Sequence, residues 1–149
     1  MPLPKQILVP IDFSPTSTFA LEYAKTLVEE LPASLHVIHV VEAPFLLNAE
    51  VTRLYREQLT EAAKAKLKTL LPAEVNGHLK ATVKITSGVP FVEIINYAEQ
   101  HEIDLIVIGT HGKGLIAQAL LGGVADKVVR TAPCPVLTVR TTEPADETA

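Results

Sequence analysis

The sequence predicts an α/β fold, a three-layer sandwich in which helices cover both faces of one five-stranded parallel sheet. Five short apolar segments alternate along the chain with four segments of helical periodicity. Several of the apolar segments are nearly continuous, which is typical of strands buried on both faces. Strands that alternate with helices form parallel sheets with right-handed crossovers. The length of 149 residues suits one such domain.

The first predicted strand, residues 5–11, is followed by a clear helix start. Ser14 is a typical N-cap, and Pro15 suits the first helical position because the N–H that it lacks would have no partner there. Pro32 ends this helix. Its apolar residues at helical spacing are Phe19, Tyr23, Ala24, Leu27, Val28 and Leu31.

The second predicted strand, residues 35–41, leads through a loop into a long helix from about residue 49 to 71. Pro72 ends this helix. Its apolar stripe comprises Val51, Tyr55, Leu59, Ala62, Ala63, Leu67 and Leu70. The loop, residues 42–48, carries Phe45, Leu46 and Leu47, and we expect these side chains to pack on the long helix rather than to form a lid.

The second half of the chain completes the alternation. Residues 81–87 predict a shorter strand near an edge of the sheet, in which Val83 and Ile85 alternate with polar residues. The next helix faces inward with Phe91, Ile94, Ile95 and Ala98. The elements after that strand are a helix at 88–101, a strand at 105–109, a helix at 124–131 and a strand at 135–139. The domain is expected to span residues 1–142, with a polar, disordered tail at 143–149.

Composition and charge exclude several classes of protein. The formal net charge is −4, whereas general nucleic-acid binders carry a basic balance or stripe. No apolar run approaches the ~20 residues of a membrane span, and the N-terminus has no signal-peptide-like apolar stretch. We therefore expect no nucleic-acid or membrane partner and a cytoplasmic location. Cys134, the single cysteine, excludes an internal disulfide and is expected to be a small buried residue.

The predicted strand order, 3-2-1-4-5, locates a binding site. Ligands of open parallel sheets bind outside the carboxyl ends of the strands where the order reverses, here between the first and fourth strands. Pro10, Ile11 and Asp12 end the first strand, and Val40 and Val41 end the second. The valines can form an apolar slot with backbone hydrogen bonds for adenine. Asp12, the only acid that the sequence places near the site, can accept hydrogen bonds from ribose or from the adenine amino group.

A glycine-rich segment follows the fourth strand. It runs Gly109-Thr110-His111-Gly112-Lys113-Gly114, and Gly122-Gly123 precedes the last helix at Val124. Glycine allows close approach of the backbone to a ligand, and helix N-termini attract anions. The segment therefore predicts a phosphate cradle. It is not a Walker P-loop, which has four residues between its glycines, nor the dinucleotide fingerprint, which follows the first strand.

Each of these features also has a purely structural explanation. Gly109 can simply turn the chain after a strand, and Asp12 can cap the turn before Ser14. Val40 and Val41 can be ordinary sheet core. The glycine pair before Val124 can be a flexible helix entry without a ligand.

Together, the motifs resemble the universal stress protein family over nearly the whole predicted domain. The matching segments are Ile7 to Asp12, Gly88-Val89-Pro90, Asp104 to Gly112, Leu120 to Ala125, and Cys134 to Leu137. The resemblance implies a Rossmann-like, flavodoxin-like domain, often a homodimer, that acts in stress tolerance. Many members bind ATP through a pattern of Gly, two residues, Gly, nine residues, Gly, then Ser or Thr. Gly109, Gly112 and Gly122 match its spacing.

The resemblance also assigns sides of the site. Asp12 and Val40 or Val41 fall on the adenosine side, and the ribose and phosphate side comprises Thr110, His111, Gly112, Gly122, Gly123 and Val124. Lys113 is a further candidate for a phosphate contact. The chain departs from the pattern at Gly123, where ATP-binding members usually carry Ser or Thr. A hydrogen bond to a charged group is worth about 1.5–3 kcal/mol, so ATP affinity could fall about ten- to a hundredfold and AMP or ADP could be preferred.

The expected function is a stress-response regulatory protein that binds ATP, ADP or AMP, with Mg²⁺ accompanying ATP, and that has little or no turnover. Two alternatives stay open: a slow ATPase or self-phosphorylating enzyme, and a dimeric interaction protein with an empty cleft, which the departure at Gly123 favours. No catalytic residue or metal ligand is assigned. His36 and His39 lie three apart in a strand and face opposite sides, which makes them a poor metal pair. The low aromatic content, 5%, disfavours a flavin.

The last predicted strand, 135–139, is an edge of the sheet under this order. Val136, Leu137 and Val139 make it apolar, and exposed apolar edges invite pairing with another chain. The alternative is that its side chains pack on the flanking helices while its edge stays hydrated. We expect a homodimer through this strand, an expectation that rests partly on the resemblance.

Overall fold

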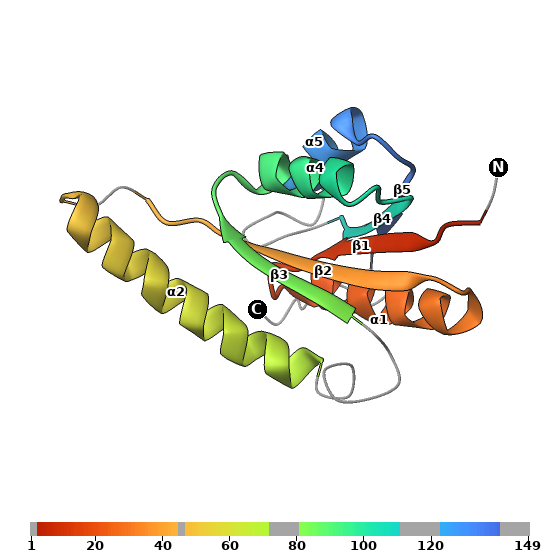
Figure 1. The fold of residues 1–149 in the computed structure, drawn as a ribbon, viewed down its shortest axis with the longest axis horizontal. Coiled ribbons are helices and arrows are strands. Elements are labelled where there is room, and N and C mark those ends of the chain that lie inside the picture. Colours follow the sequence, from red (N-terminus) through yellow and green to blue (C-terminus); the bar gives the residue numbers. More distant parts are fainter. Residues whose placement is uncertain (1–2, 45–46, 72–80, 111–122, 141–149) are drawn as a thin grey trace, which may run out of the picture.

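A computed structural model describes residues 3–44, 47–71, 81–110 and 123–140. The described elements are, in chain order, β1 (Gln6–Pro10), α1 (Pro15–Glu30), β2 (Ser34–Val41), α2 (Ala49–Leu70), β3 (Ala81–Ser87), α4 (Pro90–Gln100), β4 (Leu105–Gly109), α5 (Gly123–Thr131) and β5 (Val136–Val139). The strands pair in parallel in the order β3-β2-β1-β4-β5. The predicted fold class and strand order are therefore confirmed (Figure 1).

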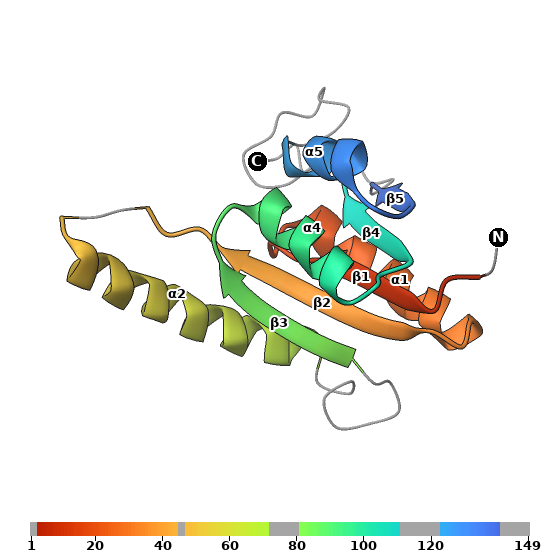
Figure 2. The same cartoon turned by 45° about the horizontal axis from the view of Figure 1, so that its top comes forward.

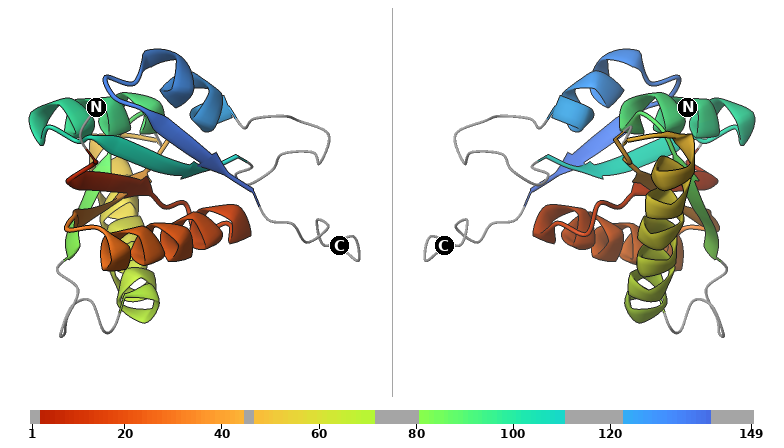
Figure 3. Two further views of the ribbon diagram at one scale, coloured as in Figure 1. Left: turned by 90° about the vertical axis from the view of Figure 1, so that its right-hand side faces the viewer. Right: turned by 90° about the vertical axis from the view of Figure 1, so that its left-hand side faces the viewer.

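Helices cover both faces of the sheet. α1 lies on one face, whereas α4 and α5 lie on the other (Figure 3). α2 runs along β2 and β3 (Figures 1 and 2) and packs on the same face as α1. Among the described residues, no helix is long and apolar enough to cross a membrane.

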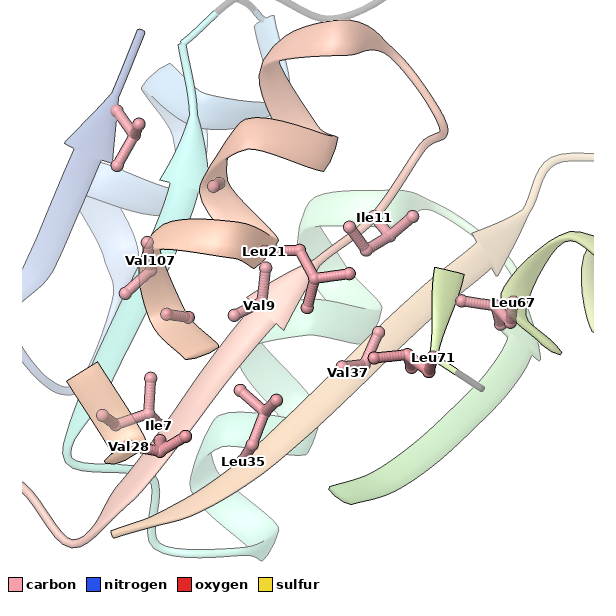
Figure 4. Close-up of a cluster of buried hydrophobic side chains, with 13 residues drawn as sticks. Ile7, Val9, Ile11, Leu21, Val28, Leu35, Val37, Leu67, Leu71 and Val107 are labelled. Atoms are coloured by element: carbon pink, nitrogen blue, oxygen red, sulfur yellow. The ribbon is translucent and has the colours of Figure 1, made fainter. Parts of the chain in front are cut away.

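Alternation along the strands divides the interior into two cores, because successive side chains of a strand point to opposite faces. Figure 4 shows the core beneath α1 and α2, where Leu21 and Leu67 meet the strand residues Ile7, Val9, Leu35, Val37 and Val107. The second core joins α4 and α5 to Leu8, Ile38, Ile106 and Ile108. β1, β2 and β4 are thus buried on both faces, as their apolar sequences predicted, whereas the edge strand β3 is mostly exposed.

The start of α1 is as predicted, and its buried face is predicted only in part. Ser14 is the N-cap, and its Oγ accepts a hydrogen bond from the Ser17 N–H at 3.3 Å. Phe19 and Tyr23, expected in the apolar stripe, are 42% and 43% exposed. The buried residues are Thr16, Ser17, Ala20, Leu21, Ala24 and Val28, of which Ala24 and Val28 were expected. Because most of these buried side chains are small, α1 approaches the sheet closely. The rings of Phe19 and Tyr23 lie outside the contact between helix and sheet.

The buried apolar residues of the long helix lie towards its carboxyl end, whereas Thr52 is the buried residue of its first turn. Ala63, Leu67 and Leu71 are buried, but Tyr55 is exposed. The amino-terminal end of α2 extends beyond the tip of β2 in Figures 1 and 2, so it has less sheet to pack against. Leu47 is 91% exposed, so the expectation that it packs on the helix is wrong.

Other predictions have mixed outcomes. β3 is an edge strand, as expected. Tyr97 is buried on α4, although it was not among the residues expected to face inward. Cys134 is only partly buried, and burial raises the pKa of its thiol. Phe45, Leu46, Pro72 and the predicted tail at 143–149 lie outside the described residues.

Candidate functional site

A cleft of about 460 Å³ opens at the carboxyl ends of β1, β2 and β4, where the strand order reverses. This is the usual position of ligands in open parallel sheets, and the volume suits a small molecule. Every predicted site residue that the structure describes lines this cleft: Pro10, Ile11, Asp12, Val40, Val41, Gly109, Thr110, Gly123 and Val124. The remaining candidates lie outside the described residues: His111, Gly112, Lys113 and Gly122.

The loop between β1 and α1 holds Asp12 at the cleft wall. Asp12 Oδ1 accepts a hydrogen bond from the Ser14 N–H at 2.9 Å, and the Asp12 N–H donates to Ser17 Oγ at 3.3 Å. Asp12 therefore does cap the turn before Ser14. It also lines the cleft, so the structural explanation and the ligand-binding explanation are compatible.

Phe13, next in the same loop, has a left-handed backbone with φ of 67°. This conformation is a genuine outlier for a bulky residue, and such strain concentrates at functional sites. The ring centroids of Phe13 and His39 lie 4.7 Å apart, and Lys66 Nζ lies 5.0 Å from the Phe13 centroid. All three residues line the cleft, and sequence reasoning assigned none of them to it. No local signal could have found them, because β1, β2 and α2 meet only in the folded chain.

The end of β2 offers a backbone edge to the cleft. The β1–β2 ladder ends with Pro10 opposite Ile38, and the Ile38 C=O accepts a hydrogen bond from the Ile11 N–H at 2.8 Å. The Val41 C=O is used on the opposite side, where it accepts from the Gly88 N–H at 3.1 Å. Backbone groups of alternate residues in a parallel strand face the same neighbour. The N–H and C=O of Val40 therefore point past the end of β1, towards the cleft.

The end of β4 and the start of α5 form the opposite wall. A Cβ at Gly109 would stand 2.8 Å from the carbonyl carbon of Thr16, so this glycine permits close packing of α1. A Cβ at Gly123, by contrast, would meet nothing within 4 Å. Thr110 is buried, and its hydroxyl has no hydrogen-bond partner among the described residues. This wall combines a helix N-terminus with an unsatisfied hydroxyl.

The cleft also holds a second acid, Glu42, so the expectation that Asp12 is the only acid near the site is wrong. Glu42 follows β2 directly, at the same edge of the sheet. In the described ranges, no three His, Cys, Asp or Glu side chains group in a way that could hold a metal ion.

The two histidines of β2 face opposite sides, as predicted. His39 Nδ1 donates to the Ile11 C=O at 2.7 Å, on the side of the cleft. His36 lies in the other layer, between the Tyr97 hydroxyl on Nδ1 and Gln6 Oε1 on Nε2, each at 2.7 Å. Burial, and secondly the nearby His101, lower the pKa of His36. A neutral His36 satisfies both contacts if Nε2 donates to Gln6 and Nδ1 accepts from Tyr97.

Known proteins share this sequence pattern and this fold. The model of the universal stress protein family matches residues 4–140. A universal stress protein of Methanocaldococcus jannaschii is 38% identical over 139 residues, which cover 91% of this chain and 82% of the relative. The structure of a universal stress protein from Lactobacillus plantarum superposes with a TM-score of 0.83 at 28% identity, covering 91% of this chain and 97% of that one.

Two more distant structures share the fold. One is a universal stress protein in complex with cAMP, at 22% identity and a TM-score of 0.59 over 91% of this chain and 96% of that one. The other is a universal stress protein family member from Arabidopsis thaliana with AMP bound, at 21% identity and a TM-score of 0.58 over 98% of this chain and 97% of that one. The sequence match over residues 4–140 and the shared fold agree: this chain belongs to the universal stress protein family.

Proposed function

We propose that the cleft binds an adenine nucleotide, ATP, ADP or AMP, and that the chain is a stress-response regulatory protein with little or no turnover. The observation that carries this proposal is the meeting, in one cleft, of Asp12, the backbone edge at Val40 and the start of α5. A nucleotide needs all three: polar groups that bind its sugar, backbone donors and acceptors that bind its base, and a positive site that binds its phosphates.

With the ribose held at Asp12, the order of donor and acceptor at Val40 favours adenine over guanine. Its N–H is a donor and its C=O an acceptor, and adenine presents a ring-nitrogen acceptor beside its amino donor. Guanine presents the opposite pair, a ring N–H beside a carbonyl. Ile11 and Val41 also line the cleft and make this wall apolar.

The first turn of α5 suits an anion. α5 starts at Gly123, so its first N–H groups have no partner within the helix, and the helix dipole adds partial positive charge there. Gly123 and Val124 line the cleft. Two distant relatives bind cAMP and AMP, which is consistent with an adenine nucleotide in this cleft.

Binding without rapid turnover is the activity that these side chains support best. Phosphoryl transfer needs groups that hold a metal and position a nucleophile. Asp12 already accepts a hydrogen bond from the Ser14 N–H, and this bond ties its carboxylate to the loop. A slow ATPase or self-phosphorylating enzyme remains the second candidate, and it predicts phosphate release that Asp12→Asn abolishes.

The test is titration of the purified protein with AMP, ADP and ATP, with and without Mg²⁺, followed by native mass spectrometry and calorimetry. GTP is the control for the base. We expect saturable binding of adenine nucleotides, no binding of GTP at the same concentrations, and no rapid release of phosphate. A folded protein that binds none of them at millimolar concentration would support the dimeric interaction protein with an empty cleft.

We further propose a homodimer that forms along β5. β5 is the last strand of the described sheet. The C=O groups of Pro135 and Val139 accept hydrogen bonds from β4, so by alternation the backbone groups of Val136 and Thr138 face outward. An unpaired strand edge is a template for a strand of another chain, here a second copy.

A further inference from the structure

The edge strand β5 is too short to hold two copies of the chain together by itself. It comprises four residues, Val136–Val139, whereas a stable protein–protein interface takes roughly 20–30 residues from each side. If two copies pair along β5, most of their contact must therefore come from the helices on either side of this edge. The exposed side chains of α1 and α5 decide what the second copy meets there.

α1 carries an exposed aromatic pair, Phe19 and Tyr23, on the flank that faces the β5 edge. α1 packs on β1 and β4 and reaches β5, whereas α2 packs on β2 and β3, so α1 lies between α2 and this edge (Figure 4). The α2 flank of α1 is marked by Lys25, whose Nζ donates to the Leu70 C=O at 3.4 Å. At 3.6 residues per turn, Phe19 and Tyr23 lie about 120° and 160° around the helix from Lys25. The pair therefore points away from α2, towards β5.

α5 carries an exposed apolar side chain, Val129, beside the same edge on the other face of the sheet. α4 packs on β2 and β3 and α5 on β5, so α5 lies between α4 and the edge (Figure 3). The α4 flank of α5 is marked by Lys127, whose Nζ lies 5.0 Å from the centroid of the Phe91 ring. Val129 lies about 160° around the helix from Lys127 and so points away from α4. Apolar side chains thus flank the β5 edge on both faces.

We propose that a second copy of this chain docks on Phe19 and Tyr23 of α1 and on Val129 of α5 when two β5 strands pair antiparallel. This inference rests on the proposed homodimer and deepens it, because it names the side chains that hold the two copies together. A two-fold axis perpendicular to the sheet presents the same patch from both copies. The two aromatic pairs would therefore lie over one face of the joined β5 strands, and the two Val129 side chains over the other. The aromatic pair contributes most, because aromatic rings bury large areas and dominate interface energetics.

The test compares the double variant Phe19→Gln/Tyr23→Gln with Leu54→Gln/Tyr55→Gln, a matched control on α2. Leu54 and Tyr55 are exposed to a similar degree, and α2 packs over β2 and β3, away from β5. Analytical ultracentrifugation measures the dissociation constant of the dimer. We expect the α1 variant to raise this constant about a hundredfold, since each substitution acts twice in a symmetric dimer. The α2 variant should change it by no more than about twofold.

A second variant reports the contact while keeping an aromatic ring in place. The chain contains no Trp, so Tyr23→Trp introduces a single indole fluorophore. We expect its emission to shift to shorter wavelength as the protein concentration rises through the dissociation constant of the dimer. When Thr138→Pro, which removes an outward N–H of β5, is added to Tyr23→Trp, the emission should no longer depend on concentration.

Other outcomes overturn the inference in distinguishable ways. If the unmodified protein is a monomer at micromolar concentration, the proposed homodimer fails and this inference fails with it. If the unmodified protein is a dimer and Thr138→Pro is a monomer, but the α1 variant dimerises as tightly as the unmodified protein, only the inference fails. Equal weakening by the α1 and α2 variants would also refute it. Should the α1 variant not fold, as denaturant unfolding would show, concentration-independent emission of a dimeric Tyr23→Trp protein would refute the contact.

Discussion

The backbone of Thr16 lies directly against Gly109: a Cβ at residue 109 would stand 2.8 Å from the Thr16 carbonyl carbon and 2.9 Å from its oxygen. Both are backbone atoms of the first turn of α1, so neither can rotate away. The missing side chain of Gly109 therefore allows α1 to start close to the end of β4. That start follows the loop that carries Asp12 and Phe13 into the cleft.

Replacement of Gly109 by alanine should destabilise the fold. The added methyl group would force α1 away from the sheet, and overpacking of this kind typically costs about 1–3 kcal/mol. Denaturant unfolding measures the change in the free energy of unfolding. The matched control is Gly123→Ala, whose Cβ would meet nothing and which should be neutral or stabilising by up to about 1 kcal/mol. Equal stability of the two variants would contradict the close packing at Gly109.

Replacement of Gly123 by serine should raise the affinity for ATP. The position has room for the side chain, and the new hydroxyl can donate to a terminal phosphate at the start of α5. We expect about ten- to a hundredfold tighter binding of ATP and a smaller gain for AMP, by calorimetry. The Gly123→Ala variant, which adds the Cβ without the hydroxyl, should show no gain. An equal gain for alanine and serine would rule out the hydroxyl as the cause.

The stability of the protein should decrease in mild acid because of His36. Its pKa is lowered in the folded protein by burial, and secondly by His101, relative to the ordinary value of 6.5. The unfolded chain therefore binds the proton at higher pH than the folded chain does. This contribution to stability is fully present above pH 6.5 and is lost as the pH falls from there towards the lowered value. The free energy of unfolding, measured between pH 7.5 and 5, should fall in this window.

The control for the His36 prediction is His36→Gln, which cannot take up a proton. It should be less stable than the unmodified protein at pH 7.5, because the Tyr97 and Gln6 contacts depend on the ring. It should nevertheless lose less stability between pH 7.5 and 5. The same pH dependence in both proteins would assign the effect to other groups.

Phe13 offers a test of backbone strain. Both Phe13→Ala and Phe13→Gly remove the ring contacts with His39 and Lys66. Only glycine adopts a φ of 67° without cost, so Phe13→Gly should be the more stable of the two by about 1 kcal/mol. This order is the reverse of that usual for glycine and alanine. Thermal or denaturant unfolding of both variants decides it, and alanine being the more stable would refute the strained conformation.

The edge of β5 can be blocked without loss of a bond inside the sheet. By alternation the N–H of Thr138 faces outward, so Thr138→Pro removes a donor that only a neighbouring chain would use. If the protein is a homodimer through this edge, Thr138→Pro should be a monomer by light scattering at micromolar concentration. Thr138→Val, which keeps the N–H, should stay dimeric. A monomeric unmodified protein at that concentration would refute the dimer.

Local sequence signals predicted the helix and strand boundaries well where a side chain acts on the backbone within one turn. The N-cap at Ser14 and the proline at position 15 started α1 as expected, because a side-chain acceptor and a fixed φ act within one turn. The predicted inner face of the same helix was right at Ala24 and Val28 but wrong at Phe19 and Tyr23. Phe19 and Tyr23 have the right spacing, but the distance between α1 and the sheet favours small residues such as Ala20 and Ala24. That distance depends on Gly109, more than eighty residues away in the chain.

The sequence by itself determined the order of strands and helices along the chain, and the strand order of the sheet was predicted from the doubly wound class that this alternation favours. These follow from hydrophobic periodicity and from the short-range chemistry of serine, proline and glycine. Only the tertiary structure decided that Phe13, His39 and Lys66 share the cleft, that Val40 rather than Val41 offers its backbone, and that the Thr110 hydroxyl has no partner. Burial and hydrogen bonding depend on neighbours that come from distant parts of the chain, so no local pattern records them.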